Sequence, residues 1–317
     1  MISVAMAVYN GERFLEEQLA SLAAQACLPG ELIVCDDGST DRSVAIARRF
    51  AEHAPFSVRI ETSDANRGST ATFEKAIRLC QGRLIATCDQ DDAWCPTKLG
   101  RIEAVMHEAP HAGFAFSDAE IVGAELQPSG ERLWGSLGFT DRRRRQFHTN
   151  GFRCLLRRNY ITGATLAFRA SLRDRLLPIP TEWVHDAWIA LVLSAIAPGL
   201  AISEPLIRYR QHGGQQIGGA RRTLRQEFQA SERVTCETFR SLHQQFEQLR
   251  SRLSAWDDVK RNSLQDLGQK LAHLAARGQM RQPGVWRLPR VLGELRRGRY
   301  LRYSRGWASA LQDLWLK

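Results

Sequence analysis

Short apolar runs alternate with longer amphipathic segments over the first 120 residues of the chain. The runs have the length of β-strands, and the segments between them repeat apolar residues at helical spacing. This alternation predicts an α/β fold with a mainly parallel sheet that helices cover on both faces. The predicted strands are residues 2–8, 31–35, 57–61, 84–88 and 113–117, and the predicted helices are residues 12–25, 41–53, 70–80 and 97–107.

Two later parts of the chain have different patterns. The apolar stretch 188–202 is short for a membrane span and is broken by Pro198-Gly199, so we expect a buried helix that runs into a strand. In the last third, apolar residues recur at steps of three and four, which predicts two amphipathic helices packed as a hairpin. These helices, within residues 224–274, could also pair across a homodimer. The positions are Phe239, Leu242, Phe246, Leu249, Leu253 and Trp256, then Leu264, Leu267, Leu271 and Leu274.

Charge divides the chain near residue 220. Residues 221–317 carry 20 Lys and Arg against 9 Asp and Glu, whereas residues 1–220 carry 24 against 25 and are nearly neutral. We therefore expect an α/β domain over residues 1–220 and a basic, mainly helical extension over residues 221–317. The arginine run at residues 142–145 is expected to lie in a solvated loop.

The location of the protein is predicted from what its sequence contains. Its seven cysteines are scattered and form no CxxC pair, which fits a reducing cytoplasm. The chain enters a strand pattern at once, and no stretch reads as a signal peptide or a membrane span. In residues 279–317, tryptophan and tyrosine alternate with arginine and leucine, which favours peripheral contact with the inner face of the plasma membrane. A helical lid with a solvated basic face explains the same pattern equally well.

Polar residues follow the predicted strands at the edge where ligands bind in such sheets. Tyr9-Asn10-Gly11 follows the first strand, and the adjacent carboxylates of Asp36 and Asp37 follow the second. Carboxylates there can accept hydrogen bonds from a base or a ribose, although a capped turn also explains part of this cluster. Asn66-Arg67-Gly68 opens the next helix, where it either approaches a phosphate or serves only as a turn.

The strongest chemical signal follows the fourth strand, in Asp89-Gln90-Asp91-Asp92-Ala93-Trp94. Three carboxylates within four residues repel one another, and burying them unpaired would be costly. A hard divalent cation, Mg²⁺ or Mn²⁺, resolves this repulsion because it takes carboxylate, water and phosphate oxygens as ligands. An exposed acidic turn is the alternative interpretation.

Together these four segments resemble the family-2 inverting glycosyltransferases, which have the GT-A fold, over roughly residues 1 to 215. The resemblance implies that Tyr9, Asp36 and Asp37 line the base pocket, with Arg67 near the base or diphosphate. It implies that Asp89 lies near the ribose. It also implies that Asp91 is the metal ligand of a DxD motif and that Asp92 supports it.

The second half of the family pattern is also present. Gly163, in Ile161-Thr162-Gly163-Ala164-Thr165, resembles the turn that shapes the sugar and acceptor pocket. Asp186 stands where the family has its Glu-Asp or His-Asp pair, which implies a catalytic base, although it could merely cap the following helix. The segment Arg208-Tyr209-Arg210-Gln211-His212 resembles bacterial rhamnosyltransferase-like members. There, Arg208 and Arg210 could offset phosphate charge, and His212 could bind the metal or simply be structural.

The resemblance implies a metal-dependent hexosyltransferase that takes its sugar from a nucleotide-diphosphate donor, dTDP-rhamnose or a UDP-hexose. The implied acceptor is a hydroxyl of a surface polysaccharide or a lipid-linked glycan. One alternative is a basic protein that binds nucleic acid or membrane and retains an inactive nucleotide-sugar domain. No recognisable nucleic-acid module accompanies the basic residues, so we expect no nucleic-acid partner. A nucleotidyltransferase ranks lower, because Asn10-Gly11-Glu12-Arg13 is not the Gly-rich basic loop that such chemistry needs.

Overall fold

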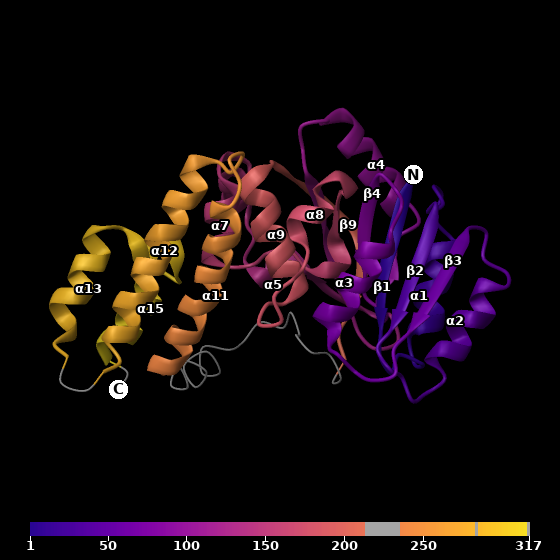
Figure 1. Ribbon diagram of the computed structural model, residues 1–317, viewed down its shortest axis with the longest axis horizontal. Coiled ribbons are helices and arrows are strands. Elements are labelled where there is room, and N and C mark those ends of the chain that lie inside the picture. Colours follow the sequence, from indigo (N-terminus) through magenta and orange to yellow (C-terminus); the bar gives the residue numbers. More distant parts are fainter. Residues whose placement is uncertain (213–234, 283–284, 316–317) are drawn as a thin grey trace. The chain divides into compact units, whose positions relative to one another are not determined.

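The computed structural model describes residues 1–212, 235–282 and 285–315 (Figure 1). These residues form two compact units, one of residues 1–144 with 160–212 and the other of residues 145–159 with 235–282 and 285–315. Residues 145–159 therefore group with the C-terminal helices. The predicted boundary near residue 220 lies outside the described residues.

The first unit is built on a nine-stranded sheet with the order β3-β2-β1-β4-β8-β6-β9-β5, and β7 pairs with β6. The strands are β1 (Ile2–Val8), β2 (Glu31–Asp36), β3 (Ser57–Thr62), β4 (Leu84–Cys88), β5 (Ala93–Trp94), β6 (Phe114–Val122), β7 (Pro128–Arg132), β8 (Leu166–Arg169) and β9 (Gly199–Arg210). The helices are α1 (Leu15–Ala23), α2 (Ser43–Ala51), α3 (Ser69–Leu79), α4 (Lys98–Glu108), α5 (Leu133–Leu137), α8 (Arg173–Leu176) and α9 (His185–Ile196), with 3₁₀ turns η1 (Gly163–Thr165) and η2 (Ala170–Leu172). Helix α6 (Asp141–Thr149) begins in this unit, and its residues 145–149 belong to the second unit.

The first four strands in sequence are parallel, as the alternating pattern predicts. Val8 lies opposite Asp36, and Met6 lies opposite Cys88, so the carboxyl ends of β2, β1 and β4 meet at one edge. Beyond β4, antiparallel pairs join β8 to β4 and to β6, while β9 runs parallel to β6. The polar loops that follow the strands are thereby brought side by side.

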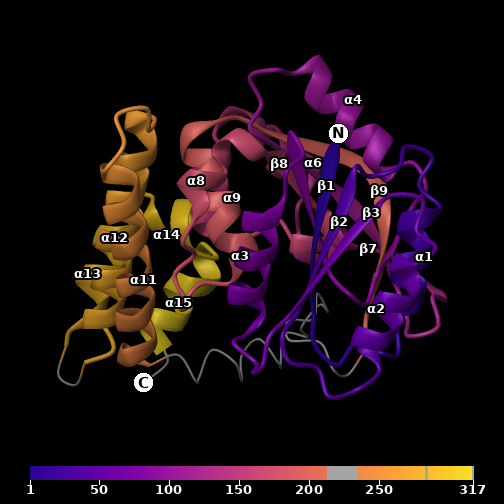
Figure 2. The same cartoon turned by 45° about the vertical axis from the view of Figure 1, so that its right-hand side comes forward.

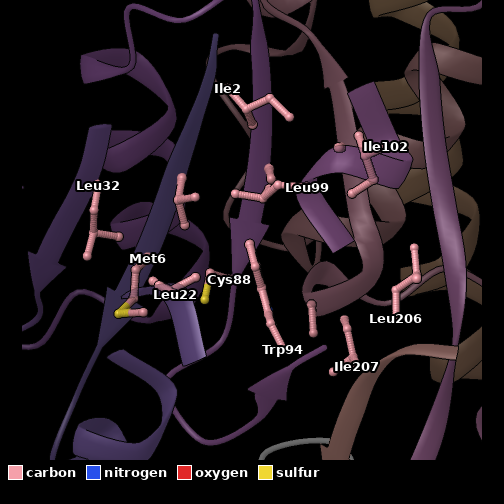
Figure 3. Packing of buried hydrophobic residues seen from close by; sticks show 14 of the residues in the cluster. Ile2, Met6, Leu22, Leu32, Cys88, Trp94, Leu99, Ile102, Leu206 and Ile207 are labelled. Atoms are coloured by element: carbon pink, nitrogen blue, oxygen red, sulfur yellow. The ribbon is translucent and has the colours of Figure 1, made fainter. Parts of the chain in front are cut away.

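One face of the sheet carries the main hydrophobic core. Ile2, Val4, Met6 and Val8 alternate along β1, so their side chains share a face and pack under α1, α2 and α4. Figure 3 shows part of this cluster, including Met6, Leu22 and Leu99. On the other side of the sheet lie α3, α8 and α9 (Figure 2).

The apolar stretch predicted as a buried helix followed by a strand forms α9 and β9. Helix α9 is buried on almost every side, from Trp188 to Ala195, which fits its lack of a polar face. Within the described parts of the chain, no helix has both the length and the apolar character needed to cross a bilayer.

The second unit contains α7 (Gly151–Arg157), α11 (Cys236–Ser254), α12 (Arg261–Gln279), α13 (Arg287–Arg296), α14 (Arg299–Tyr303) and α15 (Trp307–Trp315). Helices α11 and α12 pack against each other as the predicted hairpin and bury Leu249, Leu253, Leu267 and Leu271. The arginine run at residues 142–145 lies in helix α6, so the prediction of a loop is wrong. Asp141 begins that helix, where a carboxylate is favourable. The predicted dimer helices include residues 224–234, which lie outside the described residues.

Candidate active site

The acidic loop after β4 meets the end of β9 at the carboxyl edge of the sheet. Asp91 Oδ2 lies 2.8 Å from His212 Nε2, and both side chains are largely but not completely buried. The ring of His212 packs against Phe14, with 4.6 Å between ring centroids. The aromatic contact fixes the imidazole so that one nitrogen faces the carboxylate.

Asp92 and Arg210 hold this loop from inside the protein. Asp92 has no exposed surface, and its Oδ1 accepts a hydrogen bond from the Arg210 amide at 2.9 Å. Arg210 Nε donates to the carbonyl oxygen of Asp91 at 2.6 Å, and the rest of the guanidinium bonds to the Ala124 carbonyl and to Glu17. With 1% of its surface exposed, Arg210 braces the loop instead of facing a ligand as the sequence suggested.

The carboxylates of the loop lie close enough to perturb one another. Burial raises the pKa of Asp89, and the charges of Asp91 and Asp186 raise it further. Burial also raises the pKa of Asp92 well above its ordinary range, with Asp91 and Asp89 adding to the effect. One oxygen of Asp92, Oδ2, is buried and has no hydrogen-bond partner among the residues that the structure describes. A concentration of negative charge of this kind favours a bound cation.

Lys98 belongs to this site, although no sequence pattern singled it out. Its ammonium is buried, donates to the Ala164 carbonyl at 2.6 Å and lies 3.3 Å from the centre of the Trp94 ring. Burial lowers its pKa to about 7, while Cys88, Asp92 and Asp89 oppose that shift. Lys98 begins α4, and a lysine at the start of an amphipathic helix normally faces water. Only the packing of α4 under the sheet brings it to the carboxylates.

Tyr209 is a second residue that sequence reasoning did not single out. It is buried on β9 between Arg208 and Arg210. Burial raises the pKa of its hydroxyl, and the negative charges of Asp92, Asp89, Asp91 and Asp186 raise it further. The hydroxyl therefore stays protonated beside the acidic loop. Strand alternation was the available signal, because it separates Tyr209 from its exposed neighbour Arg208.

Asp186 lies in the first turn of α9 and contacts η1. Its Oδ2 accepts a hydrogen bond from the Gly163 amide at 3.2 Å, and Thr87 Oγ1 donates to the Gly163 carbonyl at 2.5 Å. A Cβ at residue 163 would lie 2.5 Å from His185 Nε2, a separation that real Cβ atoms do not show. Glycine at this position therefore lets the turn, the buried His185 ring and Asp186 come together.

The loops after β1, β2 and β3 are linked by side-chain to backbone hydrogen bonds. The amide and carbonyl of Tyr9 bond to the side chain of Gln90 at 2.8 and 3.0 Å, which joins the first loop to the acidic loop. Asp36 Oδ1 accepts from the amides of its own turn, at Gly38 and Ser39. These contacts explain Asp36 as a turn-forming residue, and they leave the Tyr9 ring exposed.

Asp37 connects the second loop to the third. Its two oxygens accept hydrogen bonds from the amides of Arg67 and Gly68, each at 2.8 Å. The side chains of Arg67 and Arg208 are exposed. The structure therefore brings Asp37 to the backbone of the Arg67 loop and leaves both of these guanidinium groups at the surface.

The residues at the Asp91–His212 pair fit a divalent cation. Asp91 Oδ2 and His212 Nε2 lie within hydrogen-bond distance of each other, at 2.8 Å, and a carboxylate oxygen and an imidazole nitrogen are both atoms that a divalent cation takes as ligands. Among the described residues, no group of three or more His, Cys, Asp and Glu is arranged as a complete metal site. A cation that keeps water and phosphate oxygens as ligands needs only one or two protein ligands.

The acidic residues of the site lie at the carboxyl edge of the sheet, where α/β proteins of this kind bind their ligands. The family model described as Glycosyl transferase family 2 matches residues 3–175, and the chain belongs to this family.

Relatives of known sequence agree with this assignment. The glycosyltransferase alr2836 of Nostoc sp. is 27% identical over 230 residues, which cover 71% of this chain and 70% of the relative. The Escherichia coli protein WfgD, a UDP-Glc:alpha-D-GlcNAc-diphosphoundecaprenol beta-1,3-glucosyltransferase, is 27% identical over 122 residues. That match covers 38% of this chain and only 47% of WfgD.

Solved structures share the fold. S. aureus TarS residues 1–349, in complex with UDP-GlcNAc, match with a TM-score of 0.59 and 17% identity, covering 87% of this chain and 71% of that one. The mannosyltransferase PcManGT of Pyrobaculum calidifontis, in complex with GDP-Man and Mn²⁺, matches with a TM-score of 0.52 and 19% identity, covering 99% and 87%. At these identities the likeness shows the fold.

Proposed function

We propose that the protein is an inverting glycosyltransferase that moves a sugar from a nucleotide-diphosphate donor to a hydroxyl acceptor. The proposed donor is dTDP-rhamnose or a UDP-hexose, and the proposed acceptor is a surface polysaccharide or a lipid-linked glycan. The name of WfgD describes an acceptor sugar linked to a lipid diphosphate, which supports a lipid-linked acceptor here. The nucleotide sugars bound by TarS and PcManGT support a nucleotide-diphosphate donor. Family membership disfavours the alternative of an inactive binding protein.

One observation carries the proposal. Asp91, in the loop after β4, lies 2.8 Å from His212, while Asp186, in the first turn of α9, accepts a hydrogen bond from the Gly163 amide. Glycosyl transfer with inversion needs a group that holds a cation at the leaving diphosphate and a separate base for the acceptor hydroxyl. Asp91, paired with His212, supplies the first, and Asp186 supplies the second.

Asp91 and His212 would hold Mg²⁺ or Mn²⁺, with Asp92 behind them. When bound, the cation supplies a positive charge that stabilises the departing diphosphate. Asp92 acts as a positioning residue, because its bond to the Arg210 amide fixes the end of β9 two residues before His212. Arg210 fixes the other side of the pair through the Asp91 carbonyl.

Asp186 acts as the catalytic base. It takes the proton of the acceptor hydroxyl while that oxygen forms a bond to the anomeric carbon of the sugar. The bond from the anomeric carbon to the diphosphate oxygen breaks on the opposite face, so the configuration inverts and the nucleotide diphosphate leaves. The Gly163 amide donates a hydrogen bond to Asp186 Oδ2 and so fixes the direction of the carboxylate. Gly163 therefore orients the base.

The nucleotide would lie over the loops after β1, β2 and β3. We assign the base pocket to Tyr9 and to the Asp37–Arg67 connection, with Asp36 shaping the turn beside it. Asp89 would face the ribose. The exposed guanidinium groups of Arg67 and Arg208 would reach the phosphates from the surface.

We further propose that the enzyme is cytoplasmic and that residues 1–220 form its catalytic domain. The helical extension 221–317 would make peripheral contact with the membrane. We also propose that the protein forms a homodimer through residues 224–274, which light scattering would test.

A panel of nucleotide sugars tests the function. Release of the nucleotide diphosphate is measured with Mg²⁺ or Mn²⁺ present and again after EDTA is added. We expect one donor class to turn over and EDTA to stop the reaction. If no sugar nucleotide binds more tightly with a divalent ion than with EDTA, the metal-dependent mechanism is wrong.

A further inference from the structure

Helix α15 exposes its large apolar residues. Trp307, Leu311 and Trp315 are spaced at four residues and are 64%, 53% and 80% exposed. Residues four apart lie on one face of a helix, so these three side chains form a continuous apolar stripe along α15. A surface helix of a soluble protein normally turns such a stripe inward.

The opposite face of α15 is buried, although two of its residues are polar. Ser309, Ala310 and Asp313 are buried, and Asp313 has no exposed surface. Its carboxylate accepts hydrogen bonds from Arg277 Nε at 2.6 Å and from the Tyr300 hydroxyl at 2.8 Å. Turning the helix to bury the tryptophans would expose this network and leave its buried partners unpaired, which is costly. The outward position of the stripe is therefore fixed by the core of the unit.

The helix that packs beside α15 adds more apolar surface. Helix α13 packs against α15 and exposes Leu288 and Leu292, one turn apart, while Val291 and Glu294 face inward. Trp286, just before α13, is 79% exposed. Two neighbouring helices thus present leucine and tryptophan to solvent. Several large apolar side chains exposed together on two packed helices indicate an interaction site.

The charge around this surface is of one sign. Residues 285–315 contain seven arginines and two acids. Both acids, Glu294 and Asp313, are buried, and Glu294 is paired with His273 at 2.7 Å and with Arg299 at 2.8 Å. The exposed formal charges of the segment are therefore all positive, among them Arg290, Arg296 and Arg302.

We propose that α13–α15 dock on the surface of an anionic phospholipid bilayer, with α15 lying in the interface. Tryptophan prefers the membrane–water interface, leucine enters the acyl boundary, and arginine attracts acidic headgroups. We name the set Trp307, Leu311, Trp315, Leu288 and Leu292 the interfacial face. The inference rests on the proposed function for its setting, an acceptor carried by a membrane, and is independent of the chemistry at Asp91 and Asp186.

Charge and side-chain type decide against two other occupants. A second copy docking through the same face would bring two positive surfaces together, which is unfavourable. Single-stranded nucleic acid is bound by aromatic rings over a basic groove, and leucines add nothing to base stacking. An anionic bilayer satisfies both the apolar stripe and the positive charge.

The test is co-sedimentation of the full chain with vesicles of phosphatidylcholine, alone or mixed with phosphatidylglycerol. We expect binding to the anionic vesicles that weakens as salt is added, and little binding to the neutral ones. The double variant Trp307→Gln/Trp315→Gln should bind the anionic vesicles at least about tenfold more weakly. Leu28→Gln, which changes a 43% exposed leucine in the other unit, is the matched control and should bind like the wild type.

The proposal would be overturned by wild-type protein that does not bind anionic vesicles, or by a double variant that binds them normally. If the double variant binds vesicles normally but loses dimerisation or oligonucleotide binding that the wild type shows, the face serves a second copy or a nucleic acid instead of a membrane. Nucleotide-diphosphate release with a soluble acceptor is measured in parallel. A double variant that loses vesicles but keeps this turnover separates failure of the surface from failure of the enzyme.

Discussion

Asp91 and His212 are 121 residues apart in the sequence, and their side chains meet at 2.8 Å. The contact joins the loop after β4 to the end of β9. The hydrogen bond from the Arg210 amide to Asp92 lies directly beside it. The two consecutive carboxylates therefore have different roles. Asp91 contacts His212 in the site, whereas Asp92 is buried and holds the backbone of Arg210.

Replacing Asp91 with Asn should lower metal-dependent donor turnover by about 100-fold or more, because the amide removes the negative charge that attracts the cation. Nucleotide-diphosphate release and calorimetric titration with Mn²⁺ measure the effect. Asp174→Asn, at an acid in α8 whose side chain is 97% exposed, is the matched control and should leave both unchanged. Normal Mn²⁺ affinity in Asp91→Asn would rule out this residue as a ligand.

Replacing Asp186 with Asn should lower kcat by about 10²–10⁴-fold, because an amide cannot take the acceptor proton. Affinity for the nucleotide diphosphate should stay the same, since the Gly163 amide can still bond to the side-chain oxygen. Glu182→Gln, an exposed acid four residues earlier, serves as the control for lost charge. The assignment of the base fails if Asp186→Asn transfers sugar at nearly the normal rate.

Replacing Gly163 with Ala should destabilise the protein by about 1–3 kcal/mol and reduce turnover, because the new Cβ would meet His185 Nε2 at 2.5 Å. The backbone or the ring must shift, and Asp186 shifts with the turn. Gly135→Ala in α5 has open space around the added Cβ and should be neutral or slightly stabilising. Urea unfolding and donor turnover compare the two variants, and equal stability would contradict the packing argument.

Lowering the pH should destabilise the protein through His185. Its ring is buried against Phe73, 3.9 Å between centroids, and burial lowers its pKa from about 6.5 to about 3. Between these values the unfolded chain binds a proton that the folded protein does not, so stability is full above pH 6.5 and falls as the pH drops toward 3. From pH 7 to pH 5 the loss from this residue is about 2 kcal/mol.

The variant His185→Leu isolates that effect. It lacks the titrating ring, so its free energy of unfolding should fall less between pH 7 and pH 5 than that of the wild type, by about 2 kcal/mol. His111→Leu, at an exposed histidine, should keep the wild-type slope. Urea unfolding at the two pH values gives the comparison. Equal slopes for His185→Leu and the wild type would show that the buried ring is not responsible.

The strands and helices of the first unit followed closely from local pattern. The predicted strands at residues 2–8 and 84–88 agree with β1 and β4 residue for residue. Strands of a parallel sheet between two layers of helices are buried on both faces and are therefore continuously apolar. The composition of these runs was thus enough to indicate strands of a parallel sheet. Strand β6 is longer than its prediction, because β8 and β9 pair along it and add hydrogen bonds that the sequence alone does not reveal.

Local pattern was enough to predict that acidic residues would gather at the ends of parallel strands, because strand direction and loop position follow from the alternation of elements. The role of each side chain at that edge depended on the packing of the whole unit. Arg210 was expected at the ligand and lies buried under the loop, while Lys98, which no sequence pattern singled out, is buried near the carboxylates of Asp89 and Asp92. Both outcomes depend on which elements pack together over long sequence distances, and burial, which sets charge and hydrogen bonding, is a property of that packing and not of the local sequence.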